Sequence, residues 1–136
     1  MDDLRSSVKI SAAGLHAQGM RMRTISENLA NADSLARSPG TLPYRRKVVT
    51  FKNVLDREMD ANTVRVNRVT TDQGDFGKRF DPTHPAADRD GYVLTPNVNP
   101  LIELMDMREA QRSYEANLTA INNSKAMIQR TMELLR

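Results

Sequence analysis

The sequence of 136 residues contains no cysteine and no tryptophan, and aromatic residues make up only 4% of it. The absence of cysteine excludes disulfide bonds, thiolate catalysis and cysteine-ligated zinc. A core must therefore be built from aliphatic residues and from the eight methionines, whose flexible side chains fill gaps between helices. No apolar run approaches the roughly 20 residues of a membrane-spanning helix, and Met1–Leu15 lacks a signal-peptide pattern. We therefore expect neither a membrane span nor a cleaved signal.

Sequence motifs of enzymes are also missing. The chain has no Gly-rich phosphate loop, no Gly-x-Ser-x-Gly elbow and no His-Glu-x-x-His helix. Its two histidines are His16 and His84, and several aspartates follow the second. An EF-hand interpretation of these aspartates fails, because the first ligand position would be Ala86 and the twelfth Asn97, where a glutamate is required. We expect no catalytic, cofactor or metal site, and interpret the aspartates as turn residues that accept backbone hydrogen bonds.

The charge distribution leaves one alternative function open. The net charge is +3, from 20 basic and 17 acidic residues. Tyr44–Lys47 and Phe76–Phe80 interleave cations with aromatic rings, a combination that can stack on and neutralise single-stranded nucleic acid. Acidic residues are interspersed throughout the same region, so we favour arginines that cover apolar surface or pair with acidic neighbours across a protein interface. A small nucleic-acid-binding protein remains the alternative.

Apolar residues recur at every seventh position near both ends of the chain. The rows are Val8, Leu15, Met22 and Leu29 near the start, and Met107, Tyr114, Ile121, Ile128 and Leu135 near the end. A second, interrupted row adds Leu4 and Ile25 at the start, and Leu104, Leu118 and Met132 at the end. This spacing predicts helices whose narrow apolar seam faces a partner helix.

The helix boundaries follow from capping residues. Asn99 is a favourable N-cap and Pro100 suits the first helical position, which predicts a C-terminal helix to about Leu135. The N-terminal helix is expected over residues 3–32, before the turn at Ser38–Gly40. A narrow apolar stripe buries few side chains, and the free energy gained does not match the conformational entropy lost when two long helices become ordered. We therefore expect the helices to be stabilised by contacts with neighbouring molecules. The alternative is that the stripes close one compact core in a monomer.

The middle of the chain holds five of the six prolines and four of the six glycines. Short strands are predicted over residues 47–51 and 63–66 from their β-branched content. The predicted fold class is mainly α, an elongated antiparallel pair of long, coiled-coil-like terminal helices with a small β- and loop-rich insert. Residues 1–34 would form the N-terminal helix of an assembly domain, 35–98 the insert and 99–136 the C-terminal helix of the assembly domain.

Three stretches resemble the bacterial flagellar rod and axial protein family. Ile25–Asp33, with the sequence ISENLANAD, is similar to the N-terminal signature shared by rod, hook and hook-associated proteins. Pro43–Val49 (PYRRKVV) and the segment Asp81–Asn99 resemble a proximal rod branch of the family more specifically. The C-terminal helix matches as well, most clearly at Arg112–Asn117. The resemblance covers nearly the whole chain.

This resemblance implies a structural subunit of the proximal rod rather than an enzyme. Its terminal helices would pack against those of neighbouring subunits in a hollow, torque-transmitting shaft with a central export channel. It implies export by the flagellar type III apparatus, without a cleaved signal peptide, into the periplasmic rod of the basal body. The implied partners are copies of the chain, the proximal rod proteins FlgB, FlgF and FliE, the distal rod protein FlgG, and the MS-ring and export-gate side of the basal body. Neither nucleic acid nor a cofactor is implied.

The predicted assembly interface combines the heptad residues with positions that match the family's motifs. Its members are Leu4, Val8, Leu15, Met22, Ile25, Asn28, Leu29, Asn31, Tyr44, Met107, Tyr114, Asn117, Leu118, Ile121, Ile128, Met132 and Leu135. The small residues Ala30 and Ala116 would permit a close approach of helices. The asparagine side chains would bond to backbone or partner amides and specify register.

Overall fold

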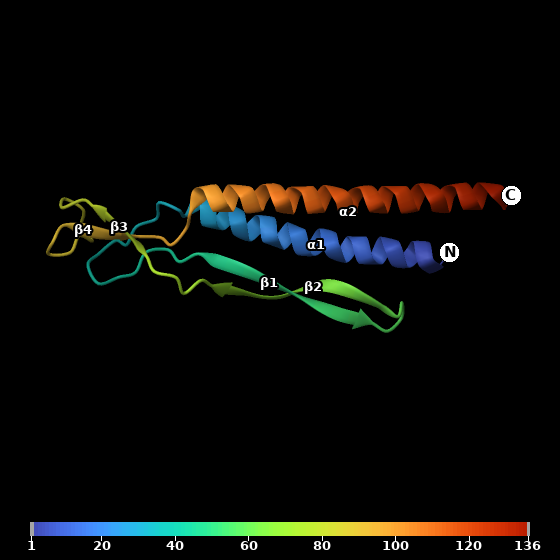
Figure 1. The fold of residues 1–136 in the computed structure, drawn as a ribbon, viewed down its shortest axis with the longest axis horizontal. Coiled ribbons are helices and arrows are strands. Elements are labelled where there is room, and N and C mark those ends of the chain that lie inside the picture. Colours follow the sequence, from blue (N-terminus) through green and yellow to red (C-terminus); the bar gives the residue numbers. More distant parts are fainter. Residues whose placement is uncertain (1, 136) are drawn as a thin grey trace. The chain divides into compact units, whose positions relative to one another are not determined.

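The computed structural model describes residues 2–135. Its elements follow in the order α1 (Asp2–Ala30), β1 (Lys47–Asp56), β2 (Ala61–Thr71), β3 (Gly77–Phe80), β4 (Tyr92–Thr95) and α2 (Pro100–Leu134) (Figure 1). The chain divides into two compact units. Unit 1 comprises Met1–Met22, Val49–Arg68 and Met107–Arg136, and unit 2 comprises Arg23–Val48 and Val69–Asp106. Among the described residues, neither helix combines the length and apolar character needed to cross a membrane.

The predicted fold class is wrong, because the chain is mixed α/β rather than mainly α with a small insert. The two terminal helices are present, but they account for 48% of the structure, and 22% is strand in two antiparallel sheets, β1–β2 and β3–β4. The prediction relied on β-branched residues and ended its strands at 51 and 66. The observed strands continue to Asp56 and Thr71 through polar residues such as Lys52 and Asn67. A two-stranded ribbon tolerates these residues because much of its surface faces solvent.

Local chemistry explains where the helices begin and end. The acidic residues Asp2 and Asp3 lie in the first turn of α1, where the helix dipole favours negative charge. At its other end Asn31 donates a side-chain hydrogen bond to the carbonyl of Glu27 at 2.9 Å. The side chain of Asn99 accepts a hydrogen bond from the backbone N–H of Leu101 at 3.1 Å. The N-cap of α2 therefore lies where the sequence predicts it.

In unit 1, α1 and α2 lie side by side and antiparallel along a seam of small and polar residues (Figure 1). The hydroxyls of Ser7 and Ser124 are 3.3 Å apart, and a Cβ added to Gly14 would lie 2.7 Å from Oδ1 of Asn117. The helix backbones can therefore approach this closely only because residue 14 is glycine. The contacting positions on α1 come one residue before the predicted apolar row, which flanks the seam.

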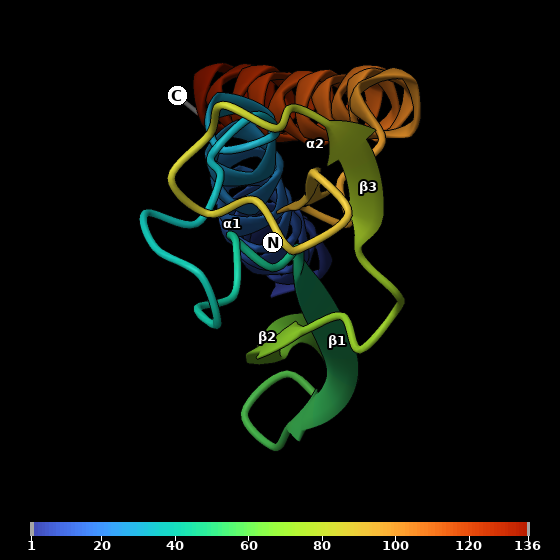
Figure 2. The ribbon, with the colours of Figure 1, turned by 90° about the vertical axis from the view of Figure 1, so that its left-hand side faces the viewer.

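Strands β1 and β2 form a twisted two-stranded ribbon (Figure 2). Side-chain hydroxyls reinforce it, because buried Thr63 donates to the carbonyl of Val54 at 3.1 Å. The turn between the strands includes Asp60, a non-glycine residue with a φ of 46°. Near this turn Glu58 pairs with Lys9 of α1 at 3.5 Å. The tip of the ribbon is therefore tied to the N-terminal part of α1.

In unit 2, β3 and β4 pair antiparallel, with Lys78 opposite Leu94 and Phe80 opposite Tyr92. The side chain of Val93, on the other face of this sheet, is fully buried. The same unit holds the end of α1, the loop that leads into β1 and the start of α2. These segments meet in a cluster of polar side chains.

Candidate functional site

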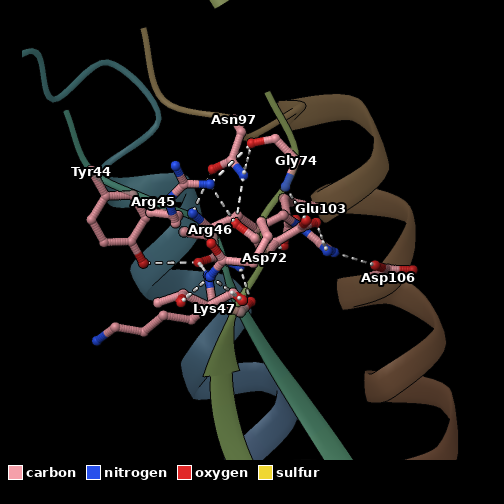
Figure 3. Close-up of polar contacts among 12 residues, drawn as sticks. Tyr44, Arg45, Arg46, Lys47, Asp72, Gly74, Asn97, Glu103 and Asp106 are labelled. Carbon is pink, nitrogen blue, oxygen red and sulfur yellow. Dashed lines mark hydrogen bonds and ion pairs between the residues drawn. The ribbon is translucent and has the colours of Figure 1, made fainter. Parts of the chain in front are cut away.

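A partly buried polar cluster joins the segments of unit 2, and we name it the polar junction (Figure 3). Its members are Asn28, Tyr44, Arg45, Arg46, Lys47, Asp72, Asn97, Glu103 and Asp106. They come from α1, from the segment that enters β1, from the loops after β2 and β4, and from the first turns of α2. Segments far apart in the sequence are thus fixed to one another by side-chain hydrogen bonds.

Asn28 is 1% exposed and uses every hydrogen-bonding group of its amide. Its Nδ2 donates to the carbonyl of Lys47 at 2.9 Å and to the carboxylate of Glu103 at 3.2 Å. Its Oδ1 accepts from the hydroxyl of Tyr44 at 2.8 Å and from the backbone N–H of Lys47 at 2.9 Å. An amide has two donors and two acceptor positions, and all four are filled here. Asn28 thus pairs with both the backbone N–H and the backbone carbonyl of Lys47, as a residue of a neighbouring β-strand would.

Glu103 is fully buried at the start of α2 and is paired with Arg46. Nε of Arg46 donates to one carboxylate oxygen of Glu103, while Asn28 donates to the other. Asp72 and Asp106 complete an acidic shell around the guanidinium, with nitrogen–oxygen distances of 3.5 and 3.6 Å. A buried carboxylate is tolerated only when it is paired and hydrogen-bonded in this way. The arrangement makes Glu103 dependent on residues from two other segments, Asn28 of α1 and Arg46 of the segment that enters β1.

The carboxylates around Arg46 stabilise its protonated, charged form. Burial alone would lower the pKa of Arg46, but the hydrogen bond to Glu103 and the nearby carboxylates outweigh burial and raise the pKa above its ordinary value. The pKa of Tyr44 is also raised, chiefly by burial and partly against the effect of Lys47. The hydrogen bond from Lys47 to Glu27, at 3.0 Å, raises the pKa of Lys47. At neutral pH Tyr44 is therefore protonated, and Arg46 and Lys47 are cations.

Arg45 and Asn97 hold the loop that follows β2. Arg45 donates to the carbonyls of Asp72 and Gly74 at 2.9 and 3.0 Å, and its guanidinium lies 4.2 Å from the ring centre of Phe76. Asn97 donates to the same two carbonyls at 3.1 and 3.3 Å and accepts from the backbone N–H of Arg46 at 2.7 Å. The loop after β2 is therefore held by hydrogen bonds from two segments, the one before β1 and the one after β4.

These contacts bear on the nucleic-acid alternative. Arg45, Arg46 and Lys47 are each engaged with carbonyls, carboxylates or an aromatic ring of the same chain. Arg79 lies 3.7 Å from Asp81. The basic segment after Tyr44 is therefore a structural tie rather than an open cationic groove, and the geometry does not favour nucleic-acid binding.

The aspartates near His84 act on the backbone of their own turns. Asp88 accepts hydrogen bonds from the backbone N–H groups of Asp90 and Tyr92 at 2.9 and 2.8 Å. Nδ1 of His84 accepts from the N–H of Ala86 at 3.0 Å. Within residues 2–135, no group of three or more histidine or acidic side chains is arranged to hold a metal ion.

The predicted interface residues occupy several different environments. Asn28 and Tyr44 lie in the polar junction, and Asn117 lies at the seam of unit 1. Ile25 and Ile121 are buried. Half-buried positions are Leu4, Val8, Leu15, Met22, Leu29, Asn31, Met107, Tyr114 and Ile128. Exposed positions are Leu118, Met132 and Leu135.

Seven of the nine junction residues were not among the predicted interface residues: Arg45, Arg46, Lys47, Asp72, Asn97, Glu103 and Asp106. Glu103 lies seven residues before Ala110 and fourteen before Asn117, and all three are at least partly buried on α2. The sequence does contain a signal for Glu103: a glutamate that shares a heptad position with residues on the inward-facing side of the helix is expected to be buried and paired. No comparable pattern marks Asn97, because its bonds depend on how two loops meet.

Comparison with known proteins identifies relatives of the whole chain. Residues 89–134 match the family described as flagellar basal body rod FlgEFG protein, C-terminal. The chain is 48% identical over 136 residues to the flagellar basal-body rod protein FlgC of Agrobacterium fabrum, covering 100% of this chain and 98% of that protein. It is 43% identical over 134 residues to FlgC of Aquifex aeolicus, covering 98% of each chain. The identity to FlgC of Bacillus subtilis is 40% over 143 residues, covering 94% of this chain and 95% of the relative.

Proposed function

The chain belongs to the FlgC family of flagellar basal-body rod proteins, and from this premise we propose that it builds the proximal part of the rod by packing its terminal helices against those of neighbouring subunits. It is a structural subunit of the flagellar basal-body rod and associates there with other rod components. The finer proposal concerns which surfaces make the contacts and which proteins lie next to it.

One observation carries the proposal: several large apolar side chains of α2 in unit 1 are exposed. Leu118, Met127 and Met132 are 43%, 53% and 58% exposed, whereas Ile121 of the same helix is buried. An isolated protein gains nothing from such a surface, whereas neighbouring helices would bury it at roughly 1.5–3 kcal/mol per side chain. The predicted interface residues remain our candidates for these contacts.

The surroundings of the subunit follow from the same proposal. We place the chain in the periplasmic rod, exported by the flagellar type III apparatus without a cleaved signal peptide, in a hollow shaft that transmits torque and encloses an export channel. Its neighbours would be copies of itself, FlgB, FlgF, FliE and FlgG, and the MS-ring and export-gate side of the basal body. Residues 1–34 and 99–136 would act together as the assembly domain, with residues 35–98 as the insert.

A charge placed on the exposed apolar surface tests this proposal. Leu118→Asp should keep the helices of the isolated chain, because the side chain is 43% exposed and reaches solvent, but should prevent incorporation into basal bodies and abolish swimming. The measurements are circular dichroism of the purified chain, its recovery with isolated basal bodies, and motility on soft agar.

Thr119→Asp is the matched control, since it adds the same charge at the next position of α2, which is also exposed. It should leave incorporation and swimming close to wild type. Normal incorporation of Leu118→Asp would contradict packing through this face of α2.

A further inference from the structure

Residues 81–91 form the loop between β3 and β4, and a histidine side chain holds part of this loop closed (Figure 1). Nδ1 of His84 accepts a hydrogen bond from the backbone N–H of Ala86 at 3.0 Å. The backbone N–H of His84 donates to the carbonyl of Asp81 at 3.2 Å, and that of Ala87 donates to the carbonyl of His84 at 3.0 Å. We refer to residues 81–87 as the His84 turn. Its imidazole is half-buried and is one of the groups that define the turn.

The composition of the His84 turn leaves few donors that could replace this hydrogen bond. Pro82 and Pro85 have no N–H group. The hydroxyl of Thr83 donates to the carboxylate of Asp81 at 2.9 Å. Ala86 has no polar side chain, so its N–H is the group that ties this part of the loop to the imidazole. The bond between His84 and Ala86 therefore decides whether the second half of the turn is closed.

This bond can exist only while the imidazole is neutral. A neutral imidazole has one nitrogen that donates and one that accepts. Because Nδ1 accepts from Ala86, the proton of the neutral ring is on Nε2. Protonation places a second proton on Nδ1, so that two donors face each other and the hydrogen bond is lost. An imidazole ordinarily titrates at about pH 6.5, whereas aspartate titrates at about pH 4.

Charged side chains of both signs surround the loop. Asp81 pairs with Arg79 of β3 at 3.7 Å, and Asp88 accepts from two N–H groups of its own turn. Lys78 of β3 lines a groove together with Ala86 and Asp88. The other charged residues are Arg89 and Asp90 of the loop and Arg37 of the segment 36–42, which lines the same groove. Because both signs are present, the hydrogen bond that protonation breaks is the main consequence of charging His84.

We propose that His84 is a pH-sensitive switch, whose neutral form closes the His84 turn and whose protonation in mild acid opens the turn at Ala86. Residues 77–80 and 92–95 have their own backbone pairing, so the β3–β4 sheet should persist and the change should be confined to the loop. Since Ala86 lines the groove beside the segment 36–42, opening the turn changes one wall of this groove. The switch operates in the isolated chain and does not rest on the proposed function.

NMR spectra of the purified, ¹⁵N-labelled full chain test the switch. At about pH 7.5 the ring nitrogen signals of His84 should show the proton on Nε2. An imidazole with the ordinary pKa passes from about one tenth to about nine tenths protonated between pH 7.5 and 5.5. Over this range the protection of the Ala86 amide against hydrogen exchange should fall about tenfold, with the same midpoint as the His84 ring signals. The amides of the β3–β4 sheet should keep their protection.

His84→Asn is the matched control, because an asparagine side chain accepts from the N–H two residues on and does not titrate. This variant should keep the turn closed and abolish the pH response of Ala86. His84→Ala has no acceptor and should leave the Ala86 amide unprotected at both pH values. His16→Asn removes the other histidine, at an exposed position of α1, and should leave the response unchanged.

Three outcomes would overturn the proposal. A neutral His84 ring with its proton on Nδ1 could not accept from Ala86. A response that persists in His84→Asn would assign the titration to another residue. Equal loss of protection in the β3–β4 sheet would show that acid unfolds unit 2 as a whole rather than opening the turn.

Discussion

Asn28 shows how a single side chain can determine a local fold. Its amide bonds to both backbone groups of Lys47 and to the side chains of Tyr44 and Glu103. No other residue type of this size offers two donors and two acceptors in one plane. This explains physically why an asparagine lies here, within a stretch that resembles an axial-protein signature. It ties the end of α1 to β1 and α2.

The substitution Asn28→Asp tests this role with almost no change in shape. It removes two hydrogen-bond donors and places a second carboxylate beside buried Glu103, so we expect a loss of about 3 kcal/mol in the free energy of unfolding at neutral pH. Protonation of the new carboxyl relieves the repulsion, so the loss should shrink as the pH falls toward about 4. Denaturant unfolding followed by circular dichroism at both pH values measures the difference.

Asn31→Asp provides the control on the same helix. Asn31 is only half-buried, and its Nδ2 makes one hydrogen bond, to the carbonyl of Glu27. Its replacement should cost about 1 kcal/mol or less. Equal losses for the two variants would show that the polar junction has no special role in stability.

At the scale of elements, the terminal helices could be predicted because their caps and their seven-residue spacing are local signals. Asn99 caps α2 as expected, and Ile25 and Ile121, both in the predicted rows, are buried. The seam could not be predicted from apolar residues, because small side chains form it and the apolar row flanks it. The extent of β1 and β2 was also missed, since their outer halves are polar and depend on pairing with each other.

Two glycines of α1 allow a test of the seam. Gly19→Ala should raise the free energy of unfolding by up to about 1 kcal/mol, because no atom lies within 4 Å of the added Cβ and alanine favours a helix. Gly14→Ala should lower it, because the Cβ would lie 2.7 to 2.9 Å from the amide atoms of Asn117. That amide is held by the carbonyl of Ser113 at 2.8 Å and cannot turn away without losing this bond.

A double substitution tests whether Gly14 and Asn117 are in direct contact. Adding Asn117→Ala to Gly14→Ala should recover much of the lost stability, because the smaller side chain leaves room for the Cβ. Thermal unfolding of the four variants forms a double-mutant cycle. Additive effects of Gly14→Ala and Asn117→Ala would contradict a close contact between the helices at this point.

At the scale of the whole molecule, stability should depend on alkaline pH through the junction. Burial raises the pKa of Tyr44 above 10.0, so the folded state holds this proton more tightly than the unfolded chain. The stabilisation is fully present below pH 10.0 and is lost as the pH rises through the folded pKa. The pKa of Lys47, raised by Glu27, acts in the same direction.

We therefore expect Tyr44→Phe to be less stable than wild type by about 1 kcal/mol at neutral pH, because the hydrogen bond to Asn28 is lost. The same variant should lose less stability than wild type between neutral pH and pH values above 10.0. Denaturant unfolding across this range measures both effects. Tyr114→Phe, on α2 outside the junction, should retain the wild-type alkaline dependence, and a matching change in both variants would contradict the assignment to Tyr44.

The candidate site was only partly predictable, for a reason that applies to the whole molecule. Asn28 and Tyr44 could be singled out because they lie in stretches that resemble a family signature. Arg46 was interpreted as one cation of a basic patch, and Glu103 as an ordinary residue of a helix. Neither residue has a neighbouring sequence pattern that indicates its ion-pair partner. Their pairing is a property of the folded chain, since 57 residues separate them.

This separation makes the start of α2 depend on the first half of the chain for its stability. Without Arg46, Glu103 would be a buried carboxylate without its counter-charge, which is costly. A truncated chain that begins after β1 should therefore leave the start of α2 frayed.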